Sequence, residues 1–177
     1  MKIYIAAGSN IDPENILKRA TGTLAQRILI NKSSMFYKTA PFGLKPGKKA
    51  DYFINGIFQA ESSLHPTEIR TLLRSIEEKY GRVRTSDLYA SRTLDLDLVL
   101  YGNWEIQTDD YTIPDPDITV RDFLSVPLKE LEPGLIIPGI DRPISEIAPS
   151  RHTMQSMPKM TAIVRTQIDI YRRLHEY

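Results

Sequence analysis

The stretch SRTLDLDLVLYG, residues 91–102, decides how this sequence folds. Leucines occupy positions 94, 96, 98 and 100, and they alternate with Asp95, Asp97, Val99 and Tyr101. Because successive side chains of a strand point to opposite faces, this alternation predicts a strand over 94–101 with its four leucines against a core. The opposite face then carries two carboxylates roughly 6–7 Å apart along the strand.

The two aspartates on that face are candidate functional residues. Neighbouring carboxylates repel each other unless a positive group lies between them. Mg²⁺ takes oxygen ligands and is often shared with substrate phosphates, so it is the natural candidate for that group. A D-x-D pair by itself is short and common, however, and more often belongs to a solvated polar strand face. The surrounding residues must decide between these two interpretations.

The loop before this strand is rich in arginine. Its sequence, GRVRTSDLYASR, covers residues 81–92 and supplies Arg82, Arg84 and Arg92. Carboxylates that hold a metal, flanked by guanidinium groups that bind phosphate oxygens in pairs, are what phosphate transfer requires. The alternative is a solvated loop whose arginines pair with Asp87 and other nearby acids.

The other predicted elements complete an α+β fold. Further strands are predicted over residues 2–7, 31–39 and 52–61, with a loop over 40–50. One helix begins at Asp12-Pro13-Glu14, with the aspartate as its capping acid, and a second begins at His65 and ends at Gly81. The resulting order, βαββαβ, is that of the ferredoxin-like sandwich, an antiparallel sheet with helices on one face.

Two further features belong to helices. Glu77 lies at the edge of the second helix's apolar stripe, so it either reaches the acid pair or is a plain helix-surface glutamate. An additional amphipathic helix near the C-terminus has an apolar side formed by Met160, Ile163, Val164, Ile168, Tyr171 and Leu174. We expect a single domain over 1–177, with a core over about 1–140 and a C-terminal extension over about 150–177.

Composition excludes several classes of protein. The chain has 177 residues, a formal net charge of +1 and no cysteine. The charge gives no support for binding nucleic acid or anionic membranes, and the absence of cysteine removes disulfides, zinc–thiolate sites and thiol nucleophiles. The apolar part of MKIYIAAGSN is too short for a signal peptide, and no stretch is long enough to span a membrane. We expect a cytoplasmic monomer whose partners are small-molecule substrates.

Several stretches together resemble one family. They are GRVR (81–84), SRTLDLDLVLYG (91–102), AAGSN (6–10), FYKTAPFG (36–43), FING (53–56), IP (113–114) and RDFLSVPLKEL (121–131). In this order, over roughly residues 1–140, they resemble the 6-hydroxymethyl-7,8-dihydropterin pyrophosphokinases of the folate pathway. The resemblance implies a ferredoxin-like α+β sandwich. It also implies transfer of pyrophosphate from ATP to the hydroxymethyl group of the pterin, with release of AMP.

The resemblance further implies a role for each site residue. Asp95 and Asp97 would hold two Mg²⁺ ions, and Arg82 and Arg92 would be catalytic, stabilising the phosphates from a loop that closes over the site. The residues at the nucleotide would be Glu77, Arg84, Leu98, Thr112 and Arg121.

The pterin pocket implied by the resemblance is formed by Thr39, Phe42, Phe53, Asn55 and Phe123. Two aromatic side chains, Phe53 and Phe123, would sandwich the flat ring, and Asn55 would supply polar recognition. Without the resemblance, core packing is the simpler explanation of these phenylalanines.

This sequence departs from the family pattern on the closing loop and on the ATP side. Leu88 and Tyr89 replace a frequent basic residue and tryptophan, Arg74 replaces a frequent glutamine, and Asp115 replaces a common histidine. Asp115 adds a negative charge where phosphates approach, unless a neighbour such as Arg74 offsets it. Since the metal acids and the pterin residues are intact, we expect the activity to be retained.

Two other interpretations stay open from the sequence. A ferredoxin-like RNA-binding module would use sheet aromatics and basic loops, but the net charge of +1 and the absence of the aromatic strand pattern count against it. A related phosphotransferase, or a degenerate member that binds pterin without turnover, is the other interpretation. The presence of Asp95, Asp97, Arg82 and Arg92 argues against degeneration.

Overall fold

The computed structural model describes residues 1–40, 51–82 and 92–174. The first part of the chain forms β1 (Lys2–Ser9), α1 (Pro13–Ala25), β2 (Leu29–Ser33), β3 (Tyr37–Thr39), β4 (Phe53–Glu61), α2 (Pro66–Lys79) and β5 (Asp95–Tyr101). The second part forms β6 (Ile106–Gln107), β7 (Thr112–Ile113), the 3₁₀ turn η1 (Pro116–Thr119), α3 (Asp122–Leu131), β8 (Ile136–Ile137), β9 (Arg142–Pro143), α4 (Ile144–Ile147), β10 (Gln155–Ser156) and α5 (Pro158–Leu174).

The main sheet confirms the predicted βαββαβ order. Its strands lie in the order β10-β3-β4-β1-β5, β2 also pairs with β4, and neighbouring strands are antiparallel. The predicted strand over 31–39 is two strands, β2 and β3. Ser34 interrupts it, because its N–H donates to the Ile57 carbonyl and its Oγ accepts from the Ile57 N–H, each at 2.9 Å. Ser34 therefore satisfies both backbone groups of Ile57, and one of the two bonds is made by its side chain instead of its backbone.

A β-bulge in β5 corrects one detail of the predicted alternation. Tyr4 pairs with Leu100, whereas Ile5 pairs with Leu98, so Val99 is an extra residue in the ladder. Such a bulge reverses the side-chain alternation beyond it. Leu94, Leu96 and Leu98 lie in one core cluster, as predicted, but Leu100 joins Val99 in the other, and Tyr101 takes its place.

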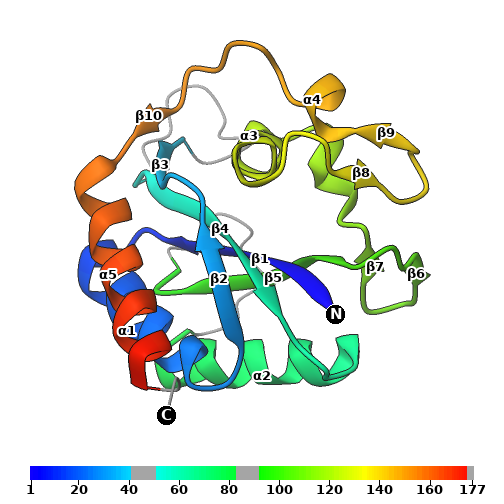
Figure 1. Ribbon diagram of the computed structural model, residues 1–177. Coiled ribbons are helices and arrows are strands. Elements are labelled where there is room, and N and C mark those ends of the chain that lie inside the picture. The colour runs from blue at the N-terminus through cyan, green and yellow to red at the C-terminus, as the bar shows by residue number, and fades with distance from the viewer. Residues whose placement is uncertain (41–50, 83–91, 175–177) are drawn as a thin grey trace.

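Helices cover both faces of the sheet, which differs from the prediction of one face. Helices α1, α2 and α5 lie on one side, and α3 and α4 lie on the other (Figure 1). The second layer forms because Tyr4, Ile57 and Val99 make half of that sheet face apolar, and Leu124 and Leu128 of α3 pack against them. The other half carries Asp95 and Asp97 and remains open to a cavity.

The helix ends follow the sequence in part. His65 caps α2 as predicted: its ring accepts from the Thr67 N–H, and Glu68 accepts from the His65 N–H at 2.7 Å, a capping box. Asp12 does not cap α1 with its side chain, contrary to the prediction. It has a φ of 44°, and its carboxylate accepts from the Asn15 amide at 3.0 Å instead.

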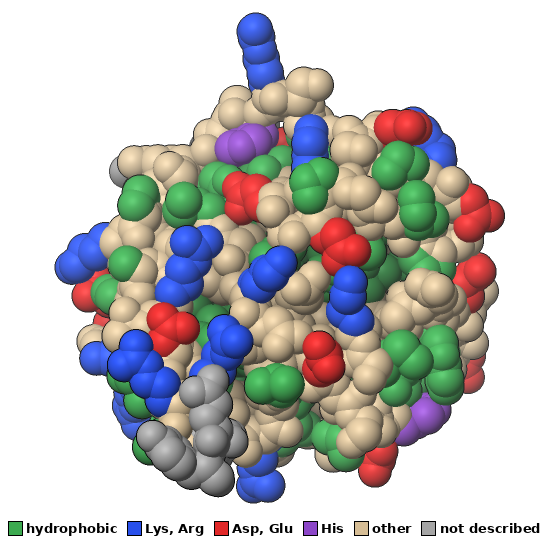
Figure 2. Space-filling view, viewed as in Figure 1, with side chains coloured by type: hydrophobic (Ala, Val, Ile, Leu, Met, Phe, Trp, Pro, Cys, Tyr) green, Lys and Arg blue, Asp and Glu red, His purple; other side chains and the backbone are tan. Residues whose placement is uncertain are grey.

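The predicted C-terminal helix is α5, and it packs on α1 and β2. Met160, Val164 and Ile168 are buried in the main core, but Leu174, predicted on the apolar side, is 64% exposed at the end of the helix. Figure 2 shows Lys and Arg side chains interspersed with Asp and Glu over the face in view, in line with the small net charge. Among the described residues, no helix is both long enough and apolar enough to cross a bilayer.

Candidate active site

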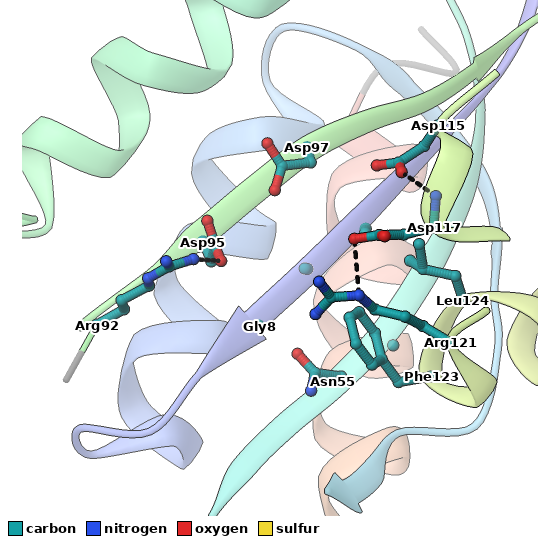
Figure 3. A pocket seen from close by; sticks show the side chains of 13 residues that line it. Gly8, Asn55, Arg92, Asp95, Asp97, Asp115, Asp117, Arg121, Phe123 and Leu124 are labelled. Atoms are coloured by element: carbon teal, nitrogen blue, oxygen red, sulfur yellow. Dashed lines mark hydrogen bonds and ion pairs between the residues drawn. The ribbon is translucent and has the colours of Figure 1, made fainter. Parts of the chain in front are cut away.

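A cavity of about 490 Å³ opens between the polar end of the sheet and the segment that joins η1 to α3 (Figure 3). Its lining combines sheet residues with that segment: Ala6, Ala7, Gly8, Asn55, Gly56, Arg92, Asp95, Asp97, Asp115, Asp117, Arg121, Phe123 and Leu124. Gly8 lies close to Asn55: a Cβ at this position would lie 2.3 Å from the Asn55 Oδ1, so the Asn55 side chain would have to move. The cavity therefore brings both predicted metal acids together with part of the predicted pterin pocket.

Asp95 is held between the two predicted catalytic arginines. Its Oδ1 lies 2.5 Å from Nη1 of Arg82, and its Oδ2 lies 2.6 Å from Nη1 of Arg92, the second pair being drawn in Figure 3. The three side chains are only partly exposed, so these ion pairs are less screened than surface pairs. Arg82 and Arg92 are thus fixed beside the aspartate pair.

Glu77 is a buried residue rather than a plain helix-surface glutamate. Its side chain is 3% exposed, and its Oε1 accepts from the Leu96 N–H at 2.7 Å. The same oxygen forms an ion pair with Arg82. Glu77 therefore joins α2 to β5 between the two aspartates and helps to orient the Arg82 guanidinium.

Asp97 has a different environment from Asp95. Its carboxylate faces the cavity and, within the described part of the chain, forms no hydrogen bond or ion pair. Its pKa is raised to about 7, first because the surrounding protein displaces bulk water and next because the Asp95 and Glu77 carboxylates repel a further negative charge. A cation bound at this carboxylate would relieve that repulsion.

The donor set fits Mg²⁺ shared with a substrate. In the described ranges, no group of three or more His, Cys, Asp or Glu side chains is arranged to hold a metal ion. Mg²⁺ does not need such a group, because it is commonly bound by one or two carboxylates together with waters and substrate phosphates. Asp95 and Asp97 on adjacent outward positions of β5 provide that arrangement.

The wall opposite the aspartate pair is formed by the η1 turn. Asp115 accepts from the Asp117 N–H at 2.8 Å, and Asp117 Oδ2 forms an ion pair with Arg121 Nε at 2.7 Å (Figure 3). Burial is the main reason why the pKa of Asp115 is raised. Arg121 and Arg70 are cations that oppose this shift, so they are neighbours that offset the negative charge of Asp115.

The predicted nucleotide residues lie in more than one place. Glu77 and Leu98 line a small cavity of about 100 Å³ on the α2 side of β5, together with Arg74, Arg82 and Asp97. Arg121 lines the larger cavity instead, and Thr112 is exposed in β7 and lines neither. Arg84 lies outside the described residues, as do Leu88 and Tyr89 of the same loop.

The predicted pterin residues gather around Asn55. Its amide Nδ2 donates to the Thr39 Oγ1 at 2.7 Å, and Phe123 lies across the same cavity. Phe53 is half-buried and pairs with Thr39 in the β3–β4 ladder, but it does not line this cavity. Phe42 falls outside the described residues.

Sequence reasoning missed two contributors. Gly8 lies within the stretch AAGSN, but nothing in the surrounding sequence indicates that the Asn55 side chain approaches this position. Asp117 lies four residues before Arg121, a spacing typical of ion pairs on one side of a helical turn, and this was the available signal.

The chain is similar to known proteins. A family model described as 7,8-dihydro-6-hydroxymethylpterin-pyrophosphokinase (HPPK) matches residues 4–133. The chain is 39% identical over 140 residues to the 2-amino-4-hydroxy-6-hydroxymethyldihydropteridine pyrophosphokinase of Haemophilus influenzae, covering 77% of this chain and 84% of that protein. It is 35% identical over 131 residues to the protein of the same name from Bacillus subtilis, covering 72% and 76%.

Solved structures show the same fold. A Plasmodium falciparum HPPK-DHPS structure with pteroate superposes with a TM-score of 0.63 at 11% sequence identity. The match covers 82% of this chain but only 41% of that longer chain. It therefore supports the α+β sandwich and the antiparallel sheet, and nothing beyond the fold.

Proposed function

The chain belongs to the 7,8-dihydro-6-hydroxymethylpterin-pyrophosphokinase family, and we propose that it carries out the family's reaction in the cavity between β5 and α3. That reaction transfers pyrophosphate to the hydroxymethyl group of the dihydropterin in folate synthesis, with ATP as the donor and AMP as the second product. Of the interpretations left open by the sequence, family membership favours this enzyme over an RNA-binding module.

The observation that carries the proposed site is the pairing of two different aspartates on one strand. Asp95 is neutralised by Arg82 and Arg92, whereas Asp97 faces the cavity without such a partner among the described residues. Both positions are rigid, because Leu94, Leu96 and Leu98 anchor the strand in the core. A phosphate-bound cation fits this combination of fixed negative and positive charge.

We assign Asp95 and Asp97 as the residues that would hold two Mg²⁺ ions together with the ATP phosphates. Bound Mg²⁺ neutralises the charge on the phosphate oxygens that it bridges. The contribution of the chain is to hold the Asp97 carboxylate in place on a rigid strand, where a bound metal ion would favour its ionised form. Arg82 helps by holding Asp95 through an ion pair, and Glu77 helps by accepting a hydrogen bond from the Leu96 N–H, next to Asp97 in β5.

Arg82 and Arg92 are proposed to stabilise the phosphates during transfer. Their guanidinium groups are held by carboxylates before substrate binds, so little reorganisation is needed when negative charge develops. Arg84, Leu98, Thr112 and Arg121 remain proposed nucleotide residues on the strength of the family motif. We also propose that the enzyme acts as a monomer.

Asn55 is proposed to recognise the pterin edge. Because its Nδ2 donates to Thr39, its Oδ1 is directed over Gly8 toward the cavity and can accept from ring N–H groups of the substrate. The Phe123 ring lies at the same cavity, where it offers a flat apolar surface to the pterin. Phe53 and Phe42 complete the proposed pocket.

The activity is tested by identifying the nucleotide product. The protein is incubated with Mg²⁺, ATP and 6-hydroxymethyl-7,8-dihydropterin, and AMP is expected to form only when the pterin is present. Formation of ADP would indicate transfer of a single phosphate and contradict the proposal. Absence of any turnover by protein shown to be folded would favour a degenerate member that binds pterin without reaction.

A further inference from the structure

The C-terminal segment, residues 152–174, lies beyond residues 4–133 that the family model matches, yet it contacts the strand that carries Thr39. We propose that this segment positions the pterin pocket and that Thr161 is the central positioning residue. The inference rests on the proposed role of Asn55 and Thr39 in binding the pterin.

The first contact is a strand pairing. β3 is only three residues long and would be bound by β4 alone without this segment. β10 pairs with its other edge, Gln155 opposite Lys38 and Ser156 opposite Tyr37. The His152 ring also packs edge-on against Tyr37, with 5.3 Å between the ring centroids. Such a short strand gains order from a second neighbour, and Thr39 is its last residue.

The second contact is made by the first turn of α5. The Oγ1 of Thr161, which is 2% exposed, accepts from the buried Phe36 N–H at 2.9 Å. The Met157 N–H donates to the Phe36 carbonyl at 2.8 Å. Both backbone groups of the residue that precedes β3 are therefore bonded to the C-terminal segment.

The Phe36 side chain connects these backbone contacts with the active-site cavity. Its fully buried ring lies directly against Gly56, where a Cβ would come within 2.8 Å of the ring. Gly56 follows Asn55 in β4 and lines the active-site cavity. A shift of the Phe36 backbone would therefore move Thr39, through β3, and Asn55, through the neighbouring Gly56, and Thr39 is the residue that orients the Asn55 side-chain amide.

The segment is a rigid support rather than a loose tail. Met160, Val164 and Ile168 lie in the main core, and Arg165 Nη2 donates to the Ser33 carbonyl at 3.1 Å. Thr153, Met154 and Gln155 also line a cavity of about 650 Å³ that shares Arg121 and Phe123 with the active-site cavity. The segment thus reaches the substrate side of the sheet as well as its edge.

The position of these contacts predicts which substrate they affect. β10 and β3 form one edge of the sheet, and β5, with Asp95 and Asp97, forms the other. Thr161 acts on the first edge, so its loss should weaken binding of the pterin while leaving the nucleotide and metal side unchanged.

The test is Thr161→Val, which keeps the shape of the side chain and removes the hydroxyl. The buried Phe36 N–H then loses its partner, and we expect the KM for the pterin to rise about three- to tenfold. The KM for ATP and the kcat should stay within about twofold. Thr161→Ser, which restores the hydroxyl, should restore the KM for the pterin. Thr166→Val, the same change at an exposed position of α5, is the matched control and should have no effect.

Two results would overturn the inference: an unchanged KM for the pterin in folded Thr161→Val, or parallel changes in both KM values and kcat. Should Thr161→Val not fold, His152→Ala at an exposed position must show the same selective rise in KM for the pterin, or the inference fails. Asn55→Ala is measured alongside. If it leaves the KM for the pterin unchanged, the proposed pocket itself is wrong. If it raises that KM and the C-terminal variants do not, only the present inference is wrong.

Discussion

At the level of single residues, Asp95 and Asp97 differ more than their sequence positions indicate. The sequence places both on one strand face, and the structure confirms this. The sequence alone could not show that two arginines hold Asp95 whereas Asp97 lines the cavity. Those contacts depend on where Arg82 and Arg92 meet the strand in the folded chain. Within the described residues, Asp97 is therefore the member of the pair that has no hydrogen-bond or ion-pair partner.

This difference predicts different stabilities for two alanine variants. Asp97→Ala should unfold at the same temperature as the wild type or higher, because it removes a carboxylate that its neighbours repel. Asp95→Ala should unfold at a lower temperature, because Arg82 and Arg92 lose their shared partner. Both variants should lose turnover by about 100-fold or more. Thermal unfolding in metal-free buffer measures the contrast, and equal midpoints for the two variants would refute it.

The raised pKa of Asp97 also predicts how stability depends on pH. Below the ordinary aspartate value of 3.8 the group is protonated in both folded and unfolded chains and contributes nothing. Between 3.8 and about 7 the folded chain holds a proton that the unfolded chain has released, so stability falls as pH rises, and above about 7 the full penalty remains. In metal-free buffer, Asp97→Asn should gain stability over the wild type across this interval. Unfolding midpoints from pH 4 to 8 test this, and a constant difference would contradict it.

At the level of elements, the sequence predicted most of what one strand or helix fixes by itself. The alternation in β5 and the helix-start signals of α2 are local; the first is confirmed as far as Leu98 and the second in full. The bulge at Val99 and the division between β2 and β3 arise from pairing with β1 and β4, which no single stretch encodes. Helix α3 was not predicted because it lies in a proline-rich region and contains Pro127.

Glu77 joins α2 to β5, and two variants of this residue should distinguish its contribution to stability from its contribution to the reaction rate. Glu77→Gln keeps an oxygen that can accept from the Leu96 N–H but removes the charge beside Arg82. Glu77→Ala leaves that buried N–H without a partner, at a cost of about 1–3 kcal/mol. We expect Glu77→Ala to be the less stable variant and both to be slower than the wild type. Chemical denaturation with steady-state kinetics measures this, and equal stabilities would show that the α2–β5 hydrogen bond contributes little.

At the level of the whole molecule, the antiparallel sheet separates the two groups of residues that we propose bind the two substrates. The β5 edge carries the acids and arginines proposed for the phosphates, and the β3–β4 side carries Thr39 and Asn55, proposed for the pterin. The cavity joins the two sides, with Arg121 and Phe123 of the α3 segment closing its opposite wall. The family motif predicted these residues from the sequence. The support of the pterin side by α5 could not be predicted, because it depends on contacts between residues more than 100 positions apart, such as the 125 positions between Phe36 and Thr161.

The most direct test of the central claim is pterin-dependent AMP formation by the wild type and by Asp97→Asn, with Mg²⁺, ATP and 6-hydroxymethyl-7,8-dihydropterin at saturating concentrations. The wild type should form AMP. Asp97→Asn, folded and at least as stable near pH 8, should form it at about one-hundredth of that rate or less. Near-normal AMP formation by the folded variant would show that the carboxylate in the cavity does not carry the reaction, and the proposed site would have to be abandoned.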